Sequence, residues 1–166
     1  MQYPQVLVYE TDGMLAAMLR ATAKEKRWAL REPRKPASCL RLLGSLCPSV
    51  LVIKMASYAP RASLSGTDLK SVLPEGESQS TVGRISNPSN REKEQVHSLE
   101  LLADVHDQFP DAAVVVVADA EDLPLSHVAW DLGASYVLGP PQSRQLLPEI
   151  VTGLMEDAID KCKFSP

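Results

Sequence analysis

The sequence predicts an α/β fold in which five parallel strands form one sheet between two layers of helices. Short aliphatic runs alternate along the chain with segments of helical periodicity, as is typical of parallel sheets with helical crossovers. One run, residues 112–117, is aliphatic throughout, as expected of a central strand buried on both faces. The chain has 166 residues, which is enough for one domain with a sizeable core.

The strands are predicted from apolar runs that end at turn-forming or charged residues. The second of them is weak and is closed by Pro33, which is tolerated only at the margin of a strand. The fifth is followed by the pair Pro140-Pro141. The predicted strands are residues 6–9, 29–32, 50–53, 112–117 and 136–138.

The helices are predicted from apolar residues at helical spacing and from start and stop signals. Asp12 and Asn90 are the expected N-caps of the first and third helices. Pro36 suits the first turn of the second helix, and Gly133 ends the fourth. The predicted helices are residues 14–27, 36–47, 90–109, 125–132 and 146–154, with a frayed end from about residue 157.

Right-handed crossovers between consecutive parallel strands restrict the possible topologies. For five strands and five helices, the strand order 2-1-3-4-5 is the flavodoxin-like (βα)5 solution, a three-layer sandwich. Residues from about 57 to 89 interrupt the pattern because they are rich in Ser, Gly, Pro and Asn and have no sustained period. We expect residues 1–166 to form a single domain with a disordered insertion at about 57–89.

Charge, hydropathy and cysteine content argue against a nucleic-acid-binding, membrane-spanning, secreted or metal-binding protein. Residues 20–41 carry eight basic and two acidic side chains, but the whole chain has a net charge of −4 and few aromatic residues, so we expect no nucleic-acid partner. No apolar run is long enough to cross a membrane, and no secretory leader is recognisable, so we expect a cytoplasmic protein. The three cysteines lack metal-ligand spacing, so we expect reduced thiols.

Lys54 is the most informative single residue. It ends the third predicted strand, and the carboxyl ends of parallel strands form the functional edge of an open α/β sheet. An ammonium group therefore lies where catalytic or ligand-binding residues usually gather.

Four segments, taken in order and spacing, resemble the receiver domain of two-component response regulators. They are residues 48–53, 98–102, 108–117 and 132–138. Without residues 57–89, the remaining chain has about the length of a receiver and covers all ten of its elements. The resemblance implies a signalling role in a phosphorelay, in which an aspartate after the third strand accepts a phosphoryl group beside Mg²⁺.

The resemblance also implies which positions carried that chemistry, and several are changed. The acid pair corresponds to Glu10 and Thr11, and the phosphate acceptor to Lys54. The hydroxyl position is Ala118, and the lysine position falls on Gly139 or Pro140. We therefore expect a degenerate pseudo-receiver that is not an enzyme and holds no metal or cofactor.

Lys54 has three candidate partners at this edge, namely Glu10, Asp12 and Asp119, and the alternative is that its side chain simply reaches solvent. The resemblance further implies a partner-binding or homodimer face formed by the fourth helix, the fifth strand and the fifth helix. Ser126, Trp130 and Tyr136 are its candidate residues, with Val128, Ala129 and Leu132 facing inward.

The predicted function is therefore a phosphorylation-independent protein-protein interaction module in signal transduction. One alternative is a phosphorylatable receiver in which Asp12 or Asp119 replaces the lost acceptor. Another is a small-molecule-binding flavodoxin-like domain, although the turn after the first strand has one glycine and two acids and would repel a phosphate.

Overall fold

The computed structural model describes residues 3–45, 49–55, 90–142 and 144–164. Its five strands form one parallel sheet of order β2-β1-β3-β4-β5, which confirms the predicted fold class. The strands are β1 (Gln5–Tyr9), β2 (Ala29–Arg31), β3 (Ser49–Lys54), β4 (Ala113–Val117) and β5 (Tyr136–Leu138). The expected insertion at about 57–89 lies outside the described residues.

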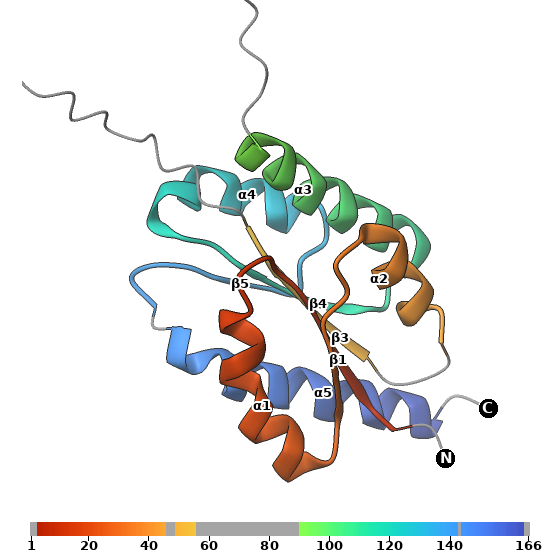
Figure 1. Cartoon of the computed structure of the whole chain (residues 1–166). Helices are drawn as coiled ribbons and strands as arrows, with labels where there is room; N and C mark the ends of the chain where they lie inside the picture. The colour runs from red at the N-terminus through yellow and green to blue at the C-terminus, as the bar shows by residue number, and fades with distance from the viewer. Residues whose placement is uncertain (1–2, 46–48, 56–89, 143, 165–166) are drawn as a thin grey trace, which may run out of the picture.

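The helices form a layer on each face of the sheet (Figure 1). The α-helices are α1 (Met14–Lys26), α2 (Pro36–Leu43), α3 (Asn90–Gln108), α4 (Leu123–Asp131) and α5 (Leu147–Phe164). Two short 3₁₀ turns, η1 (Ala120–Asp122) and η2 (Arg144–Leu146), precede α4 and α5. None of the helices in the described residues is long and apolar enough to cross a membrane.

The alternation of side chains along the strands produces two cores, one on each face. Leu7, Leu51 and Val116 face the layer of α2, α3 and α4, whereas Val6, Val52 and Val115 face α1 and α5. All six are at most 1% exposed. Because β3 and β4 are covered on both faces, their sequences are continuous apolar runs rather than alternating ones.

Several helix ends differ from the prediction. α2 ends at Leu43 and α4 begins at Leu123, rather than at residues 47 and 125, and Asn90 is the first residue of α3 and not its N-cap. The N-cap of α1 is Gly13, with φ of 73°, and not Asp12; the turn requires positive φ, which glycine adopts without strain. At the other end of the chain, α5 continues to Phe164, so the expected fraying from residue 157 is wrong. Val151 and Met155 on α5 are fully buried against the sheet, and this packing holds the helix together.

Gly133 and Gly153 provide a matched pair for a stability prediction. Gly133 has φ of 89°, and a Cβ placed there would lie 2.2 Å from Nδ1 of His106. Gly153 lies inside α5 with open space around it. We expect Gly133→Ala to lower the free energy of unfolding by about 1–2 kcal/mol and Gly153→Ala to raise it by about 0.5–1 kcal/mol. Urea unfolding measures both, and equal effects of the two variants would contradict this assignment.

Candidate functional site

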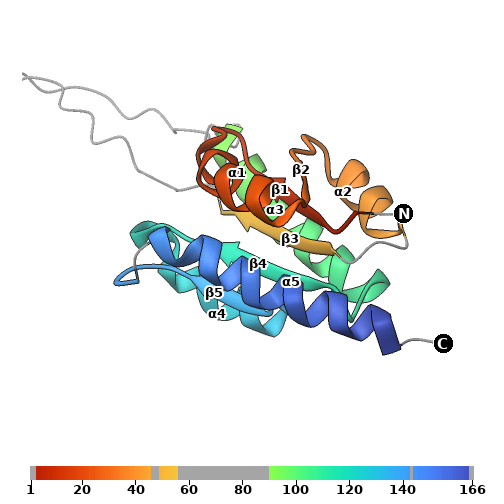
Figure 2. The same cartoon turned by 90° about the horizontal axis from the view of Figure 1, so that it is seen from below.

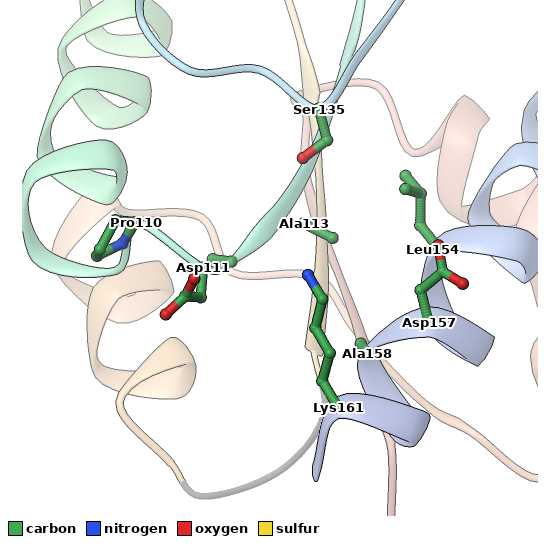
Figure 3. Close-up of a pocket in the computed structure, with 9 residues that line it drawn as sticks. Pro110, Asp111, Ala113, Ser135, Leu154, Asp157, Ala158 and Lys161 are labelled. Atoms are coloured by element: carbon green, nitrogen blue, oxygen red, sulfur yellow. The ribbon is translucent and has the colours of Figure 1, made fainter. Parts of the chain in front are cut away.

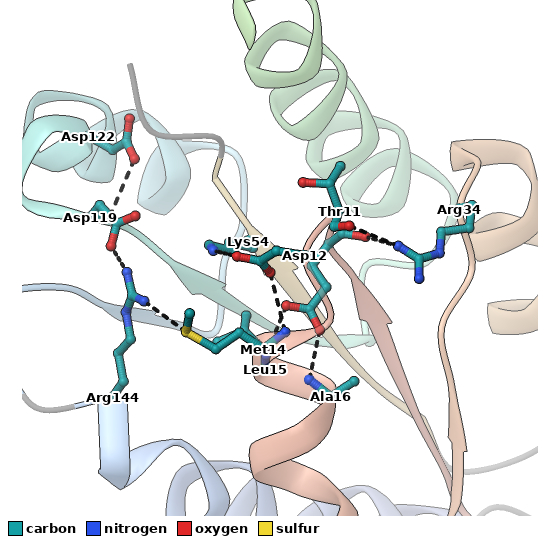
Figure 4. Close-up of polar contacts among 11 residues, drawn as sticks. Thr11, Asp12, Met14, Leu15, Ala16, Arg34, Lys54, Asp119, Asp122 and Arg144 are labelled. Atoms are coloured by element: carbon teal, nitrogen blue, oxygen red, sulfur yellow. Dashed lines mark hydrogen bonds and ion pairs between the residues drawn. The ribbon is translucent and has the colours of Figure 1, made fainter. Parts of the chain in front are cut away.

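Charged side chains from four segments gather at the carboxyl edge of the sheet (Figure 4). All five strands run parallel, so the residues that follow β1, β3 and β4 meet at one edge. Glu10 and Asp12 follow β1, Lys54 ends β3, and Asp119 follows β4. Arg144 reaches this edge from η2, just before α5.

Lys54 forms an ion pair with Asp12, in which Nζ donates to Oδ2. The Lys54 side chain is only 15% exposed and that of Asp12 is 41% exposed. Partial burial alone would raise the pKa of Asp12, but the Lys54 ammonium and the backbone N–H of Met14 outweigh it and lower that pKa. Of the three expected partners of Lys54, the structure places Asp12 against it.

Glu10 has a different role at this edge. The residue is 6% exposed, and its two carboxylate oxygens accept hydrogen bonds from the backbone N–H groups of Leu15 (2.9 Å) and Ala16 (2.7 Å). These donors belong to the first turn of α1, where backbone N–H groups lack helical partners and favour a negative charge. Burial nevertheless raises the pKa of Glu10, and neighbouring Asp12 raises it further. Glu10 therefore serves as a structural cap for α1.

Asp119 is paired with Arg144 rather than with Lys54. The guanidinium of Arg144 also contacts Sδ of Met14 at 3.5 Å, so it links the end of β4 to the start of α1. The backbone N–H of Asp119 donates to Oδ2 of the buried Asp122 at 3.4 Å. The Asp119–Arg144 ion pair therefore connects the loop after β4 with the segment before α5.

Arg34 holds the loop after β1 from the other side. Its Nη1 donates to the carbonyl oxygens of Glu10 and Thr11, each at 3.2 Å, and its Nη2 lies 3.7 Å from Oε2 of Glu32. The loop that carries Asp12 is therefore fastened at Arg34 as well as at Lys54.

The other positions that the receiver resemblance implies carry no charged side chain at this edge. Thr11 is exposed, Ala118 is buried with 2% exposure, and Gly139 and Pro140 follow β5. The peptide bond between Pro140 and Pro141 is cis. None of these four side chains is charged.

The residues present do not fit the Mg²⁺ ion that the resemblance implies. Mg²⁺ requires free oxygen ligands in near-octahedral geometry, whereas both oxygens of Glu10 accept from the helix and Asp12 is neutralised by Lys54. Across the described residues, no group of three His, Cys, Asp or Glu side chains is arranged to hold a metal.

The candidate interface residues lie around α4 and β5. Trp130 is 49% exposed, and its ring meets that of Tyr136 edge to face, with centroids 6.5 Å apart. Ser126 is half-buried. Val128 does not face inward as the sequence predicts, because it is 38% exposed. The buried face of α4 is centred on the fully buried Ala129, and Val128 lies at its margin.

Sequence reasoning missed Arg34, Arg144 and Met14 as members of this site. Their place in the chain offers one signal: Arg34 follows β2 and Arg144 follows β5, so both lie after strands that end at the functional edge. A systematic inspection of every strand-to-helix connection would have found these two arginines. The contact of Met14 with Arg144 has no such signal.

A pocket of about 270 Å³ lies at the opposite, amino edge of the sheet. Figure 3 shows Lys161 extending from α5 toward the start of β4, with Asp111 and Asp157 on either side. Asp111 and Lys161 also line a neighbouring hollow of about 360 Å³. Ligands of open α/β sheets bind at the carboxyl edge, so the position of these hollows does not favour the small-molecule alternative.

The Lys54–Asp12 pair predicts a specific dependence of stability on pH. The pKa of Asp12 in the folded protein lies below its ordinary value of 3.8. The ion pair therefore stabilises the fold fully above about pH 4, and this stabilisation is lost as the pH falls through the lowered pKa. We expect Asp12→Asn to be less stable than wild type at pH 7 by about 1 kcal/mol, after discounting for solvent screening. The difference should shrink below about pH 4.

Urea unfolding of both proteins between neutral and acid pH measures this difference. The raised pKa of Glu10 acts in the opposite direction and favours the fold at low pH. Because Asp12 is one of the causes of that raised pKa, Asp12→Asn also weakens this opposing effect, which makes the expected difference at neutral pH smaller. A difference between them that stays constant over the whole pH range would show that the ion pair does not stabilise the fold.

The comparisons with known proteins agree with this topology. No protein-family model and no curated protein sequence matches the chain. Solved structures do match, and receiver domains are among them. The receiver domain of an HD domain-containing protein from Pseudomonas fluorescens Pf-5 has a TM-score of 0.61 and 16% identity, covering 99% of this chain and 96% of that one.

Two further receivers show the same likeness. A CheY-like receiver domain protein from Methanospirillum hungatei JF-1 has a TM-score of 0.59 and 10% identity, covering 96% of this chain and 99% of that one. The receiver domain of NtrX from Brucella abortus has a TM-score of 0.57 and 14% identity, covering 91% and 98%. At these identities the likeness is one of fold, and it confirms the flavodoxin-like architecture.

Proposed function

We propose that the chain is a pseudo-receiver, a non-enzymatic protein-interaction module of a signalling system that works without phosphorylation. The observation that carries this proposal is the ion pair of Lys54 with Asp12. This pair lies at the carboxyl edge of the sheet, where receivers carry out phosphotransfer. Lys54 ends β3, the strand after which the receiver resemblance implies the phosphate acceptor.

The chemistry at this edge is unfavourable for phosphotransfer. An ammonium cannot form an acyl phosphate, and its charge opposes the Mg²⁺ that neutralises a transferring phosphoryl group. The two acids that could replace the acceptor are both engaged, Asp12 with Lys54 and Asp119 with Arg144. These contacts also argue against the alternative of a phosphorylatable receiver with a displaced acceptor.

Incubation with radiolabelled acetyl phosphate and Mg²⁺ tests the proposal. We expect no acid-stable, base-labile label on the wild-type chain. The variants Asp12→Asn and Asp119→Asn locate any label that does form. Label on wild type that one of these variants abolishes would establish the displaced-acceptor alternative and overturn the proposal.

We further propose that Trp130 and Tyr136 form the centre of the partner-binding face, with Ser126 beside them. Large aromatic side chains that are partly exposed are favoured anchors in protein interfaces, and Trp130 is 49% exposed. The same face is the proposed site of homodimer formation.

The cytoplasmic location expected from the sequence remains a prediction.

Substitution of Trp130 tests this face. We expect Trp130→Ala to weaken capture of the chain's protein partners at least tenfold, because truncation of an interface anchor costs roughly 2 kcal/mol or more. Tyr3→Ala is the matched control, since Tyr3 is an aromatic residue that is 65% exposed on a different segment. If Trp130→Ala still captures the same partners and still self-associates as wild type does, this face is not the binding site.

A further inference from the structure

The edge of the sheet formed by β2 carries an unusual concentration of positive charge. Residues 20–41 hold eight basic side chains and only two acidic ones, and all eight basic residues are exposed. The rest of the chain has nine basic and nineteen acidic residues. The positive charge is therefore local to α1, β2 and α2 within an otherwise acidic protein.

Three of these basic residues have acidic partners. Glu32 lies 3.6 Å from Arg20 and 3.7 Å from Arg34, and Lys26 lies 3.3 Å from Glu156. The other five form no ion pair with any residue that the structure describes. We call these five the basic edge: Lys24, Arg27, Arg31, Lys35 and Arg41.

The fold places the basic edge around an outermost strand. β2 pairs only with β1 in the described sheet, and α1 and α2 lie at the same end of the sheet as β2 (Figure 2). Arg31 is in register with Leu7, whose side chain packs on the face of α2. Arg31 therefore faces the layer of α2, which contains Arg41 and has Lys35 as its N-cap. Lys24 and Arg27 lie at the end of α1, which covers the other face of the sheet next to the start of β2.

We propose that the basic edge binds a short acidic segment of a partner protein. Five exposed cations without internal partners are complementary in charge to such a segment and would attract it over a distance of about the Debye length, roughly 8–10 Å at moderate salt. This surface is separate from the face around Trp130, so the two could be occupied by different parts of a partner or by different partners.

Two other anionic partners fit the surface less well. A long nucleic acid would extend beyond the edge onto a remainder with an excess of acids, and the only aromatic residue within residues 20–41, Trp28, is half-buried. A membrane surface favours cations on one plane with apolar side chains beside them. None of the large apolar residues that are exposed in the described chain falls within residues 20–41.

Fluorescence anisotropy with a short labelled peptide of alternating Glu and Ser tests the proposal on the full chain. We expect binding that weakens as salt rises and that requires the glutamates, so that the same peptide with Gln in their place does not bind. Arg31→Glu combined with Lys35→Glu should weaken binding about tenfold or more. Lys161→Glu changes an exposed lysine of α5 at the amino edge of the sheet, outside residues 20–41. It is the control and should have little effect.

The other outcomes each overturn the proposal. An equal loss with Lys161→Glu would mean that the peptide responds only to overall charge. Stronger binding of duplex DNA or of phosphatidylserine vesicles than of the peptide would assign the surface to that partner. Aggregation of the double variant without any change in peptide affinity would show that these charges only protect an open sheet edge. Circular dichroism confirms that each variant is folded.

Discussion

Replacement of Lys54 with aspartate is expected to make the stability of the fold depend on Mg²⁺. The substitution places a third carboxylate beside Glu10 and Asp12 and removes the cation that neutralises Asp12. Without a divalent ion we expect a loss of about 2 kcal/mol, which is less than for a fully buried pair because Asp12 is 41% exposed. Millimolar Mg²⁺ should restore part of this loss by binding the folded state.

Thermal unfolding with and without Mg²⁺ measures the effect. Lys54→Met is the matched control, since it removes the charge, keeps most of the side-chain volume and adds no ligand oxygen. We expect neither this variant nor wild type to gain stability from Mg²⁺. A comparable gain in wild type would mean that the edge already holds a cation beside Lys54, and the proposed loss of the metal site would be wrong.

The second large effect is expected for Glu10→Ala. This change removes both acceptors of the N–H groups of Leu15 and Ala16, and these two residues are fully buried. Water cannot replace the carboxylate without opening the start of α1. We expect a loss of about 3 kcal/mol in the free energy of unfolding, because a lost cap and unsatisfied buried donors each contribute.

Urea unfolding measures this loss, and two controls sharpen it. Glu10→Gln keeps one carbonyl acceptor and most of the side-chain shape, so it should lose less than Glu10→Ala. Glu25→Gln removes an exposed acid from the same helix and should change stability by no more than about 0.5 kcal/mol. An unchanged Glu10→Ala variant would show that the helix start does not depend on this cap.

The fold was predictable because each strand and helix has its own pattern of apolar residues in the sequence. The run over Ala113–Val117 and the run that ends at Lys54 are continuous because their strands are covered on both faces. The right-handed crossover rule then leaves few strand orders. The prediction was less accurate at helix ends, because a single residue can determine where a helix begins. For example, Gly13 and not Asp12 is the N-cap of α1.

The candidate site was predictable in position but not in pairing. That Lys54 lies at the carboxyl edge follows from the ends of the strands, and this edge does bring Glu10, Asp12 and Asp119 near one another. Which of these acids pairs with Lys54 depends on the other groups that each acid can bind. Glu10 is taken by backbone donors and Asp119 by Arg144, and these competitors come from other segments that a strand-by-strand pattern does not connect.

The position of the first strand and the last helix has a practical consequence for experiments. β1 begins and α5 ends at the amino edge of the sheet, which is opposite the edge that carries Lys54, and Figure 1 shows the start of β1 and the end of α5 near each other. An affinity tag, a fluorescent fusion or a biosensor surface attached before β1 or after α5 is therefore joined at the edge opposite the Lys54–Asp12 pair.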